Sequence, residues 1–269
     1  MKRSIVALLA IMSSSCVPYP EDAPPPVSSR SAITNAGFAP LDAGANMLDS
    51  LHFTVRAYGG DETKLVSTTA EDCYNRIMMD TNLYSFMPSG LYQIVVYADH
   101  DEYKRKTSQP EWSGGVTLGN AIYTYEGPAL SRTLAHEMTH LIFFEFMGRV
   151  NLDHRWVNEG LAVYEEQKAA GPGDLFSQVR SGLSHAPLPM DQMVSLAPAT
   201  EAQYTVSLWY AESESLVRFM IDHGGHIGFA QFLGELQKGQ TFDRAIAVGF
   251  PSVWRDLNDF YSAWQRNGQ

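Results

Sequence analysis

The pattern of hydrophobic and polar positions predicts strands in the first half of the chain and helices in the second. Residues 51–58 alternate in character and are rich in β-branched and aromatic side chains, which is typical of a strand. Residues 91–98 (LYQIVVYA) have the clearest strand pattern of the chain. Residues 114–125 predict another strand, or a short hairpin about Gly119 and Asn120.

Helical spacing begins at residues 64–80, where the predicted inner face comprises Leu65, Val66, Cys73, Ile77 and Met78. A helix is also predicted over residues 128–147, because proline suits the first helical position and glycine suits the position just past the end. Helical patterns then cover residues 153–170, 206–223, 226–238, 241–248 and 252–266. Strands followed by helices indicate an α+β domain.

We therefore expect one folded domain over residues 46–269. Its upper part, residues 46–147, would hold a mixed β-sheet and the helix over residues 128–147, and its lower part, residues 148–269, would be mostly helical. The composition supports a folded chain, because 45% of the residues are hydrophobic and 12% are aromatic, unlike those of disordered segments.

The first 15 residues (1–15) predict a signal peptide. Lys2 and Arg3 precede an apolar stretch at residues 5–12 that is too short to span a bilayer. The small residues that end at Cys16 resemble a bacterial lipobox, in which the cysteine is lipidated. Ordinary cleavage near Ser15, with release of the protein, is the alternative.

The following residues, 16–45, predict a tether. Their proline and serine content, highest over residues 18–31, and their lack of apolar periodicity are typical of an extended spacer. We expect the protein at the bacterial cell envelope, on the periplasmic side of the outer membrane in a Gram-negative host. A lipid anchor on Cys16 would be its one link to the membrane, and without lipidation the protein would be secreted.

Charge and cysteine content exclude several functional classes. The chain has 30 acidic and 19 basic residues, for a formal charge of -11. Such a surface repels phosphate backbones, so we expect no nucleic acid partner. The two cysteines, Cys16 and Cys73, allow neither a disulfide scaffold nor a cysteine-rich metal site.

The predicted helix over residues 128–147 contains the sequence HEMTH. His136 and His140 lie one turn apart on the same helix face, so both imidazoles can reach one metal ion. Glu137 lies about a third of a turn from His136 and points toward a water bound to that metal. The apolar run that follows indicates a buried helix, and buried histidines need partners.

A second segment, WVNEGLAVYEE at residues 156–166, adds another ligand type. Glu159 follows His140 by nineteen positions, which completes the pattern HExxH-x18-E. Two histidines and one glutamate with an open fourth position are a standard set for zinc that works on water. Together the two segments resemble the gluzincin metallopeptidases, and among these the ones with a catalytic domain like that of aminopeptidase N. They resemble still more closely the small bacterial envelope proteins described as peptidase MA-like.

This resemblance implies a zincin-like peptidase domain, with roles for individual residues. His136, His140 and Glu159 would bind Zn²⁺, and Glu137 would act as the general base. The chemistry of zinc indicates the same roles, because zinc lowers the pKa of bound water toward about 7 and polarises a carbonyl oxygen. A carboxylate that is not a ligand can then take the proton and return it to the leaving amine.

Two further features would complete such a site. Glu166 lies two helical turns after Glu159 and could accept a hydrogen bond from a ligand imidazole, although a solvated acidic pair with Glu165 is the alternative. In the aminopeptidase-like gluzincins, a tyrosine on a later helix donates to the oxyanion. Tyr210 holds the comparable place in this chain, and Tyr204 is its competitor.

The strand predicted within residues 116–124 precedes the zinc helix, where this family has an exposed edge strand to which an extended peptide can pair. The chain has no GxMEN-like segment to bind a free amino terminus, which favours an endopeptidase or a restricted peptidase over an exopeptidase. We therefore expect a zinc-dependent peptidase that acts on peptides or proteins. The alternative is a non-catalytic envelope lipoprotein that uses the zincin fold as a binding scaffold.

Overall fold

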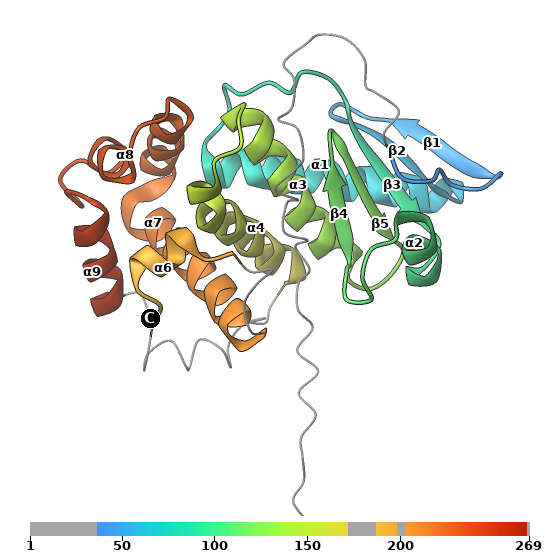
Figure 1. Cartoon of the computed structure of the whole chain (residues 1–269). Helices are drawn as coiled ribbons and strands as arrows, with labels where there is room; N and C mark the ends of the chain where they lie inside the picture. The colour runs from blue at the N-terminus through green and yellow to red at the C-terminus, as the bar shows by residue number, and fades with distance from the viewer. Residues whose placement is uncertain (1–36, 172–186, 198–202, 268–269) are drawn as a thin grey trace, which may run out of the picture.

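The computed structural model describes residues 37–171, 187–197 and 203–267, and it confirms the predicted α+β architecture (Figure 1). A mixed sheet is formed by β1 (Ala45–Asp49), β2 (Phe53–Tyr58), β3 (Tyr92–Tyr97), β4 (Gly115–Leu118) and β5 (Ala121–Tyr125), in the order β1-β2-β3-β5-β4. β2, β3 and β5 are parallel, whereas β1 and β4 pair antiparallel at the two edges. The predicted signal peptide, Cys16 and most of the predicted tether lie outside the described residues.

The helices are α1 (Gly60–Thr81), α2 (His100–Thr107), α3 (Leu130–Met147), the 3-10 helix η1 (Leu152–His154), α4 (Arg155–Ala170), α6 (Met190–Ser195), α7 (Gln203–Gln237), α8 (Phe242–Gly249) and α9 (Leu257–Asn267). In Figure 1 the sheet occupies one side of the molecule and α7, α8 and α9 the other, with α3 and α4 between them. None of the helices in the described ranges is long and apolar enough to cross a membrane.

The two faces of the sheet carry separate hydrophobic cores. Along β3, Ile94 and Val96 belong to the main core with α1 and α3, whereas Val95 and Tyr97 belong to a smaller core with α2. This alternation follows from the two-residue period of a strand. Phe38, from the region predicted as a tether, also packs on the smaller core.

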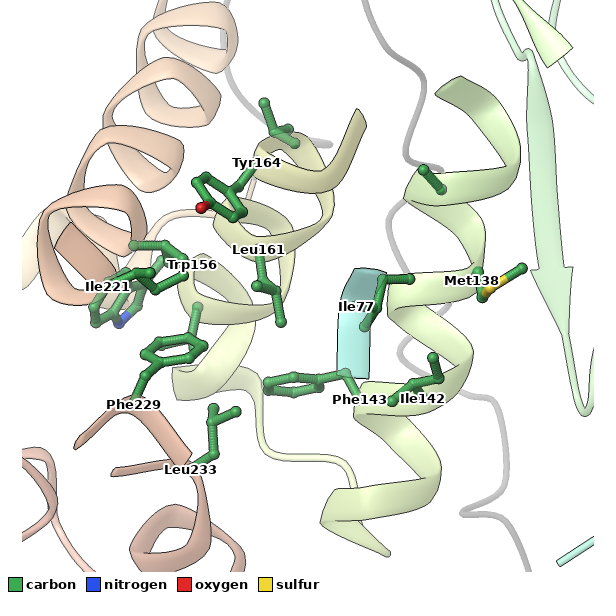
Figure 2. Packing of buried hydrophobic residues seen from close by; sticks show 14 of the residues in the cluster. Ile77, Met138, Ile142, Phe143, Trp156, Leu161, Tyr164, Ile221, Phe229 and Leu233 are labelled. Atoms are coloured by element: carbon green, nitrogen blue, oxygen red, sulfur yellow. The ribbon is translucent and has the colours of Figure 1, made fainter. Parts of the chain in front are cut away.

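A close contact joins α4 to α7 in the helical half. Figure 2 shows Phe143 of α3 and Leu161 of α4 in the space between their helices, with Trp156 directed toward α7. A Cβ at Gly160 would lie 2.3 Å from the backbone oxygen of Ser213 in α7. Only a residue without a side chain allows the two backbones to approach this closely.

Glycines mark helix ends and breaks as the sequence predicts. Gly148 follows α3 in the left-handed conformation, with φ 64°, although α3 begins at Leu130, two residues after the predicted start. Gly225 is non-helical, with φ 78° and ψ 159°, at the predicted end of the helix over residues 206–223. The helix resumes directly afterwards, so the two predicted helices are parts of the kinked α7.

In the upper half, the predicted inner face of α1 is wrong at one residue, and two elements were not predicted. Leu65 was expected on the inner face of α1, but its side chain is 59% exposed, because the buried stripe begins one position later at Val66. Cys73, Ile77 and Met78 are buried as predicted. The hydrophobic pattern predicted neither β1 nor α2.

Candidate metal centre

α3 and α4 bring the three predicted metal ligands together. His136 and His140 lie on α3 and Glu159 lies on α4, and all three are buried. Glu159 Oε2 is 3.7 Å from His140 Nε2 and 4.0 Å from His136 Nε2. The ligand atoms of the group lie within 4.8 Å of one another, close enough to bind one ion.

The donor set fits a metal ion on chemical grounds. Glu159 Oε2 is buried and has no hydrogen-bond partner among the described residues. A buried carboxylate oxygen without a partner is costly, and a cation at this position would remove the cost. Two imidazole nitrogens and one carboxylate oxygen are a set that Zn²⁺ accepts, with a fourth position open to water.

A second layer of hydrogen bonds orients the two imidazoles. His136 Nδ1 lies 3.0 Å from Glu166 Oε2, and His140 Nδ1 lies 3.1 Å from Asn158 Oδ1. With a proton on each Nδ1, both rings donate to these oxygens and present Nε2 toward the metal position. Asn158 was not among the predicted site residues, although its place directly before Glu159 was the available signal.

The alternative in which Glu165 and Glu166 form a solvated acidic pair is wrong. Glu165 is 0% exposed and Glu166 is 4% exposed. Glu166 contacts His136 on α3, whereas Glu165 contacts Arg76 on α1, with Glu165 Oε2 2.9 Å from Arg76 Nε. Adjacent positions on a helix point about 100° apart, so the two carboxylates serve different neighbours.

The charges around His136 favour a proton on its ring when no metal is bound. Burial opposes the charged form, but the hydrogen bond to Glu166 and the nearby carboxylates of Glu137 and Glu159 raise the pKa of His136 to about 9. A metal ion therefore competes with a proton for this ring, and its affinity should rise with pH.

Glu137 lies on α3 beside the edge strand β4. Its side chain is buried, and burial raises the pKa of its carboxyl group, against the opposing effects of both ligand histidines and of a hydrogen bond from Thr117. Thr117 Oγ1 donates to Glu137 Oε2 over 2.8 Å. β4 is the last strand in the sheet order and lies in the segment, residues 116–124, that was predicted as an edge strand preceding the helix of His136 and His140.

The predicted oxyanion donor stays a prediction. Tyr210 lies on α7 and is 8% exposed, with its ring centroid 5.2 Å from that of Trp209 in an edge-to-face arrangement. Tyr204 lies in the first turn of α7, but its side chain is outside the described part of the chain.

Comparison with known protein families agrees with this arrangement. Residues 69–267, which are more than half of the chain, match the model of the Peptidase MA superfamily. The match includes α1, α3, α4 and α7 for most or all of their lengths and contains the whole His-His-Glu group. A search of curated proteins finds no match. The chain belongs to the peptidase MA superfamily.

Proposed function

We propose that the protein is a zinc-dependent peptidase of the gluzincin type. The observation that carries this proposal is the buried group of His136, His140 and Glu159, with Glu137 beside it on α3. Membership of the peptidase MA superfamily supports a metallopeptidase. The donor set supports zinc in particular.

The proposed mechanism assigns one task to each side chain. A zinc ion held by the three ligands would supply a Lewis acid that polarises the scissile carbonyl group and acidifies water. Glu137 accepts the proton of the attacking water at its carboxylate and passes it to the nitrogen of the leaving amine. Tyr210, with Tyr204 as its competitor, is our proposed donor to the developing oxyanion.

The proposed substrate is an extended segment of a peptide or protein. β4 is an edge strand next to Glu137, and such an edge can pair with an extended chain through main-chain hydrogen bonds. This mode of binding recognises backbone more than side chains, which fits an endopeptidase. We further propose that a lipid anchor on Cys16 holds the enzyme at the bacterial cell envelope.

Zinc analysis of the purified protein tests the metal assignment. We expect about one zinc ion per chain in the wild type and little in His140→Ala, because a site with three protein ligands loses most of its affinity with one of them. His223→Ala, which changes a histidine on α7 outside the group, is the matched control and should keep its zinc. Full zinc occupancy in His140→Ala would refute the assignment.

A further inference from the structure

The edge strand β4 contacts the proposed general base at two positions. Gly115 and Thr117 are two residues apart and therefore face the same side of the sheet, toward α3. A Cβ at Gly115 would lie 3.2 Å from Glu137 Cγ and 2.7 Å from Thr133 Cγ2. The stem of Glu137 thus lies against the backbone at Gly115, and its carboxylate lies at the hydroxyl of Thr117.

The hydroxyl proton of Thr117 has two acceptors within reach. Oγ1 is 2.8 Å from Glu137 Oε2 and 3.0 Å from the backbone oxygen of the same residue. A threonine hydroxyl carries one proton, and a bond to an ionised carboxylate is the stronger of the two. The backbone oxygen inside a helix also accepts from the amide four residues later. The carboxylate is therefore the main partner.

β4 is itself held firmly, so it can serve as a fixed reference for the carboxylate. The hydroxyl of Tyr103 and Ser113 Oγ lie 2.6 Å apart, and Ser113 Oγ donates to the backbone oxygen of Gly115 over 3.0 Å. Thr124 of β5 donates to the backbone oxygen of Gly114 over 2.8 Å. These buried hydroxyl groups, from α2, from the residues before β4 and from β5, fix the start of β4.

We propose that Thr117 is a positioning residue that holds the carboxylate of Glu137 in the orientation from which it takes up the proton. This proposal rests on the proposed function of Glu137 as general base. Proton transfer depends steeply on the geometry of the base, so a carboxylate free to rotate is a poorer one. In this arrangement one strand aligns both the extended substrate and the base.

Two substitutions at Thr117 separate the hydroxyl from the shape of the side chain. Thr117→Val removes the hydroxyl and keeps the β-branched form that suits a strand, whereas Thr117→Ser keeps the hydroxyl. The matched control is Thr54→Val on β2, where Thr54 Oγ1 donates to Asp49 Oδ1 over 2.7 Å. β3 and β5 lie between that strand and β4.

The kinetic readout uses a panel of internally quenched peptides of mixed sequence, with zinc content measured in parallel. We expect Thr117→Val to lower kcat by about 10- to 100-fold with KM and zinc content unchanged, as loss of base geometry requires. Thr117→Ser should recover most of kcat, and Thr54→Val should match the wild type. An unchanged kcat in Thr117→Val, or a raised KM at constant kcat, overturns the proposal.

The second readout does not depend on catalysis. Crystal structures of the wild type and Thr117→Val, grown under the same conditions, should show the Glu137 carboxylate against β4 in the first and rotated away in the second. An unmoved carboxylate in Thr117→Val overturns the proposal. If the wild type cleaves none of the peptides, the proposed function fails, and the crystal structures still decide whether Thr117 holds the carboxylate.

Discussion

Glu159 and Glu165, two glutamates of α4, are both buried but have different neighbours. Glu159 Oε2 and Glu165 Oε1 are both buried, and neither accepts a hydrogen bond from a nitrogen or hydroxyl donor among the described residues. Near Glu159 lie the Nε2 atoms of two imidazoles from α3. Near Glu165 lie Arg76, with its Nε 2.9 Å from Oε2, and the charge of Asp80. The neighbours, and not the unpaired oxygen, distinguish the two positions.

The neighbours determine what can complete each group. Arg76 and Lys168 supply cations to Glu165 and Asp80 from within the chain. Burial and the charge of Asp80 raise the pKa of Glu165 to about 8, against the effect of Arg76, so a proton can neutralise this carboxyl group. The imidazoles beside Glu159 can offer Nε2 lone pairs to a metal ion, which at His136 competes with the proton that its ring otherwise holds. An unpaired buried carboxylate indicates a metal only among such donors.

The largest expected effect is on the catalytic rate, which should fall when Glu137 is changed beside the metal group but not when Glu165 is changed. Glu137→Gln removes the proposed proton acceptor and keeps the zinc ligands, so peptide cleavage should fall by about 10²–10⁴, the equivalent of about 3–5 kcal/mol, with zinc content unchanged. Glu165→Gln is the matched control on the other side of α4 and should keep kcat near the wild-type value. Wild-type cleavage by Glu137→Gln would place the catalytic site elsewhere.

The same comparison decides between enzyme and scaffold. If the wild type cleaves no peptide of the panel and Glu137→Gln supports cells as well as the wild type does, the non-catalytic scaffold is correct. Cleavage by the wild type that is lost in Glu137→Gln contradicts the scaffold.

The next effect concerns the contribution of the Arg76–Glu165 contact to the free energy of unfolding. Above about pH 8, where Glu165 is ionised, Arg76→Met leaves Glu165 and Asp80 without this cation and should lower the free energy of unfolding by about 2–4 kcal/mol. This is less than for a fully buried pair, because the Arg76 side chain is 23% exposed. Urea unfolding measures the loss, and zinc content should stay constant. The double variant Arg76→Met/Glu165→Met should be more stable than Arg76→Met, and equal or lower stability would contradict a buried charge as the cause.

The sequence predicts that His136, His140 and Glu159 lie together because the information for this grouping is local. The positions of His136 and His140 follow from helical spacing, and Glu159 lies in a second helix with a characteristic segment. The strand β3 and the hairpin of β4 and β5 follow from the alternation of apolar residues and from the glycine between them. Each of these signals lies within one or two elements of the fold.

The features that the sequence did not predict depend on packing or on polar signals. α2 is largely charged, with Tyr103 as its buried aromatic residue. Its sequence signal was Asp99, an N-cap residue type three positions before Glu102, and in the structure Asp99 accepts a hydrogen bond from the amide of Glu102. The contact of Thr117 with Glu137 joins residues 20 positions apart, and that of Arg76 with Glu165 joins residues 89 positions apart. No periodic pattern encodes such pairs.

A smaller effect is expected from the close contact between α4 and α7, which supports the helix that carries Glu159. Gly160→Ala places a Cβ against the backbone of Ser213, which cannot move aside easily, so unfolding free energy should fall by about 1–3 kcal/mol. Gly160 follows Glu159 directly, so zinc affinity should fall as well. Gly234→Ala on α7, where a Cβ meets nothing within 4 Å, is the control and should stabilise by about 0.4–1 kcal/mol. Equal stability of the two variants would show that α4 can shift freely.

The last prediction concerns the pH dependence that the proton on Glu165 gives to the stability. Its pKa rises from an ordinary 4.5 to about 8 on folding, so the folded state binds this proton more tightly than the unfolded state does. The resulting stability is complete below about pH 4.5 and is lost as the pH rises through 8, by no more than about 1.4 kcal/mol per pH unit. His136 and Glu212 also have raised pKa values but are common to the wild type and Glu165→Gln, so the difference between the two isolates Glu165. Urea unfolding of both proteins across this range should give a steeper decline for the wild type. Parallel curves would mean that Glu165 is ionised throughout, with Arg76 as a sufficient partner, and the contrast with Glu159 would then rest on cations alone.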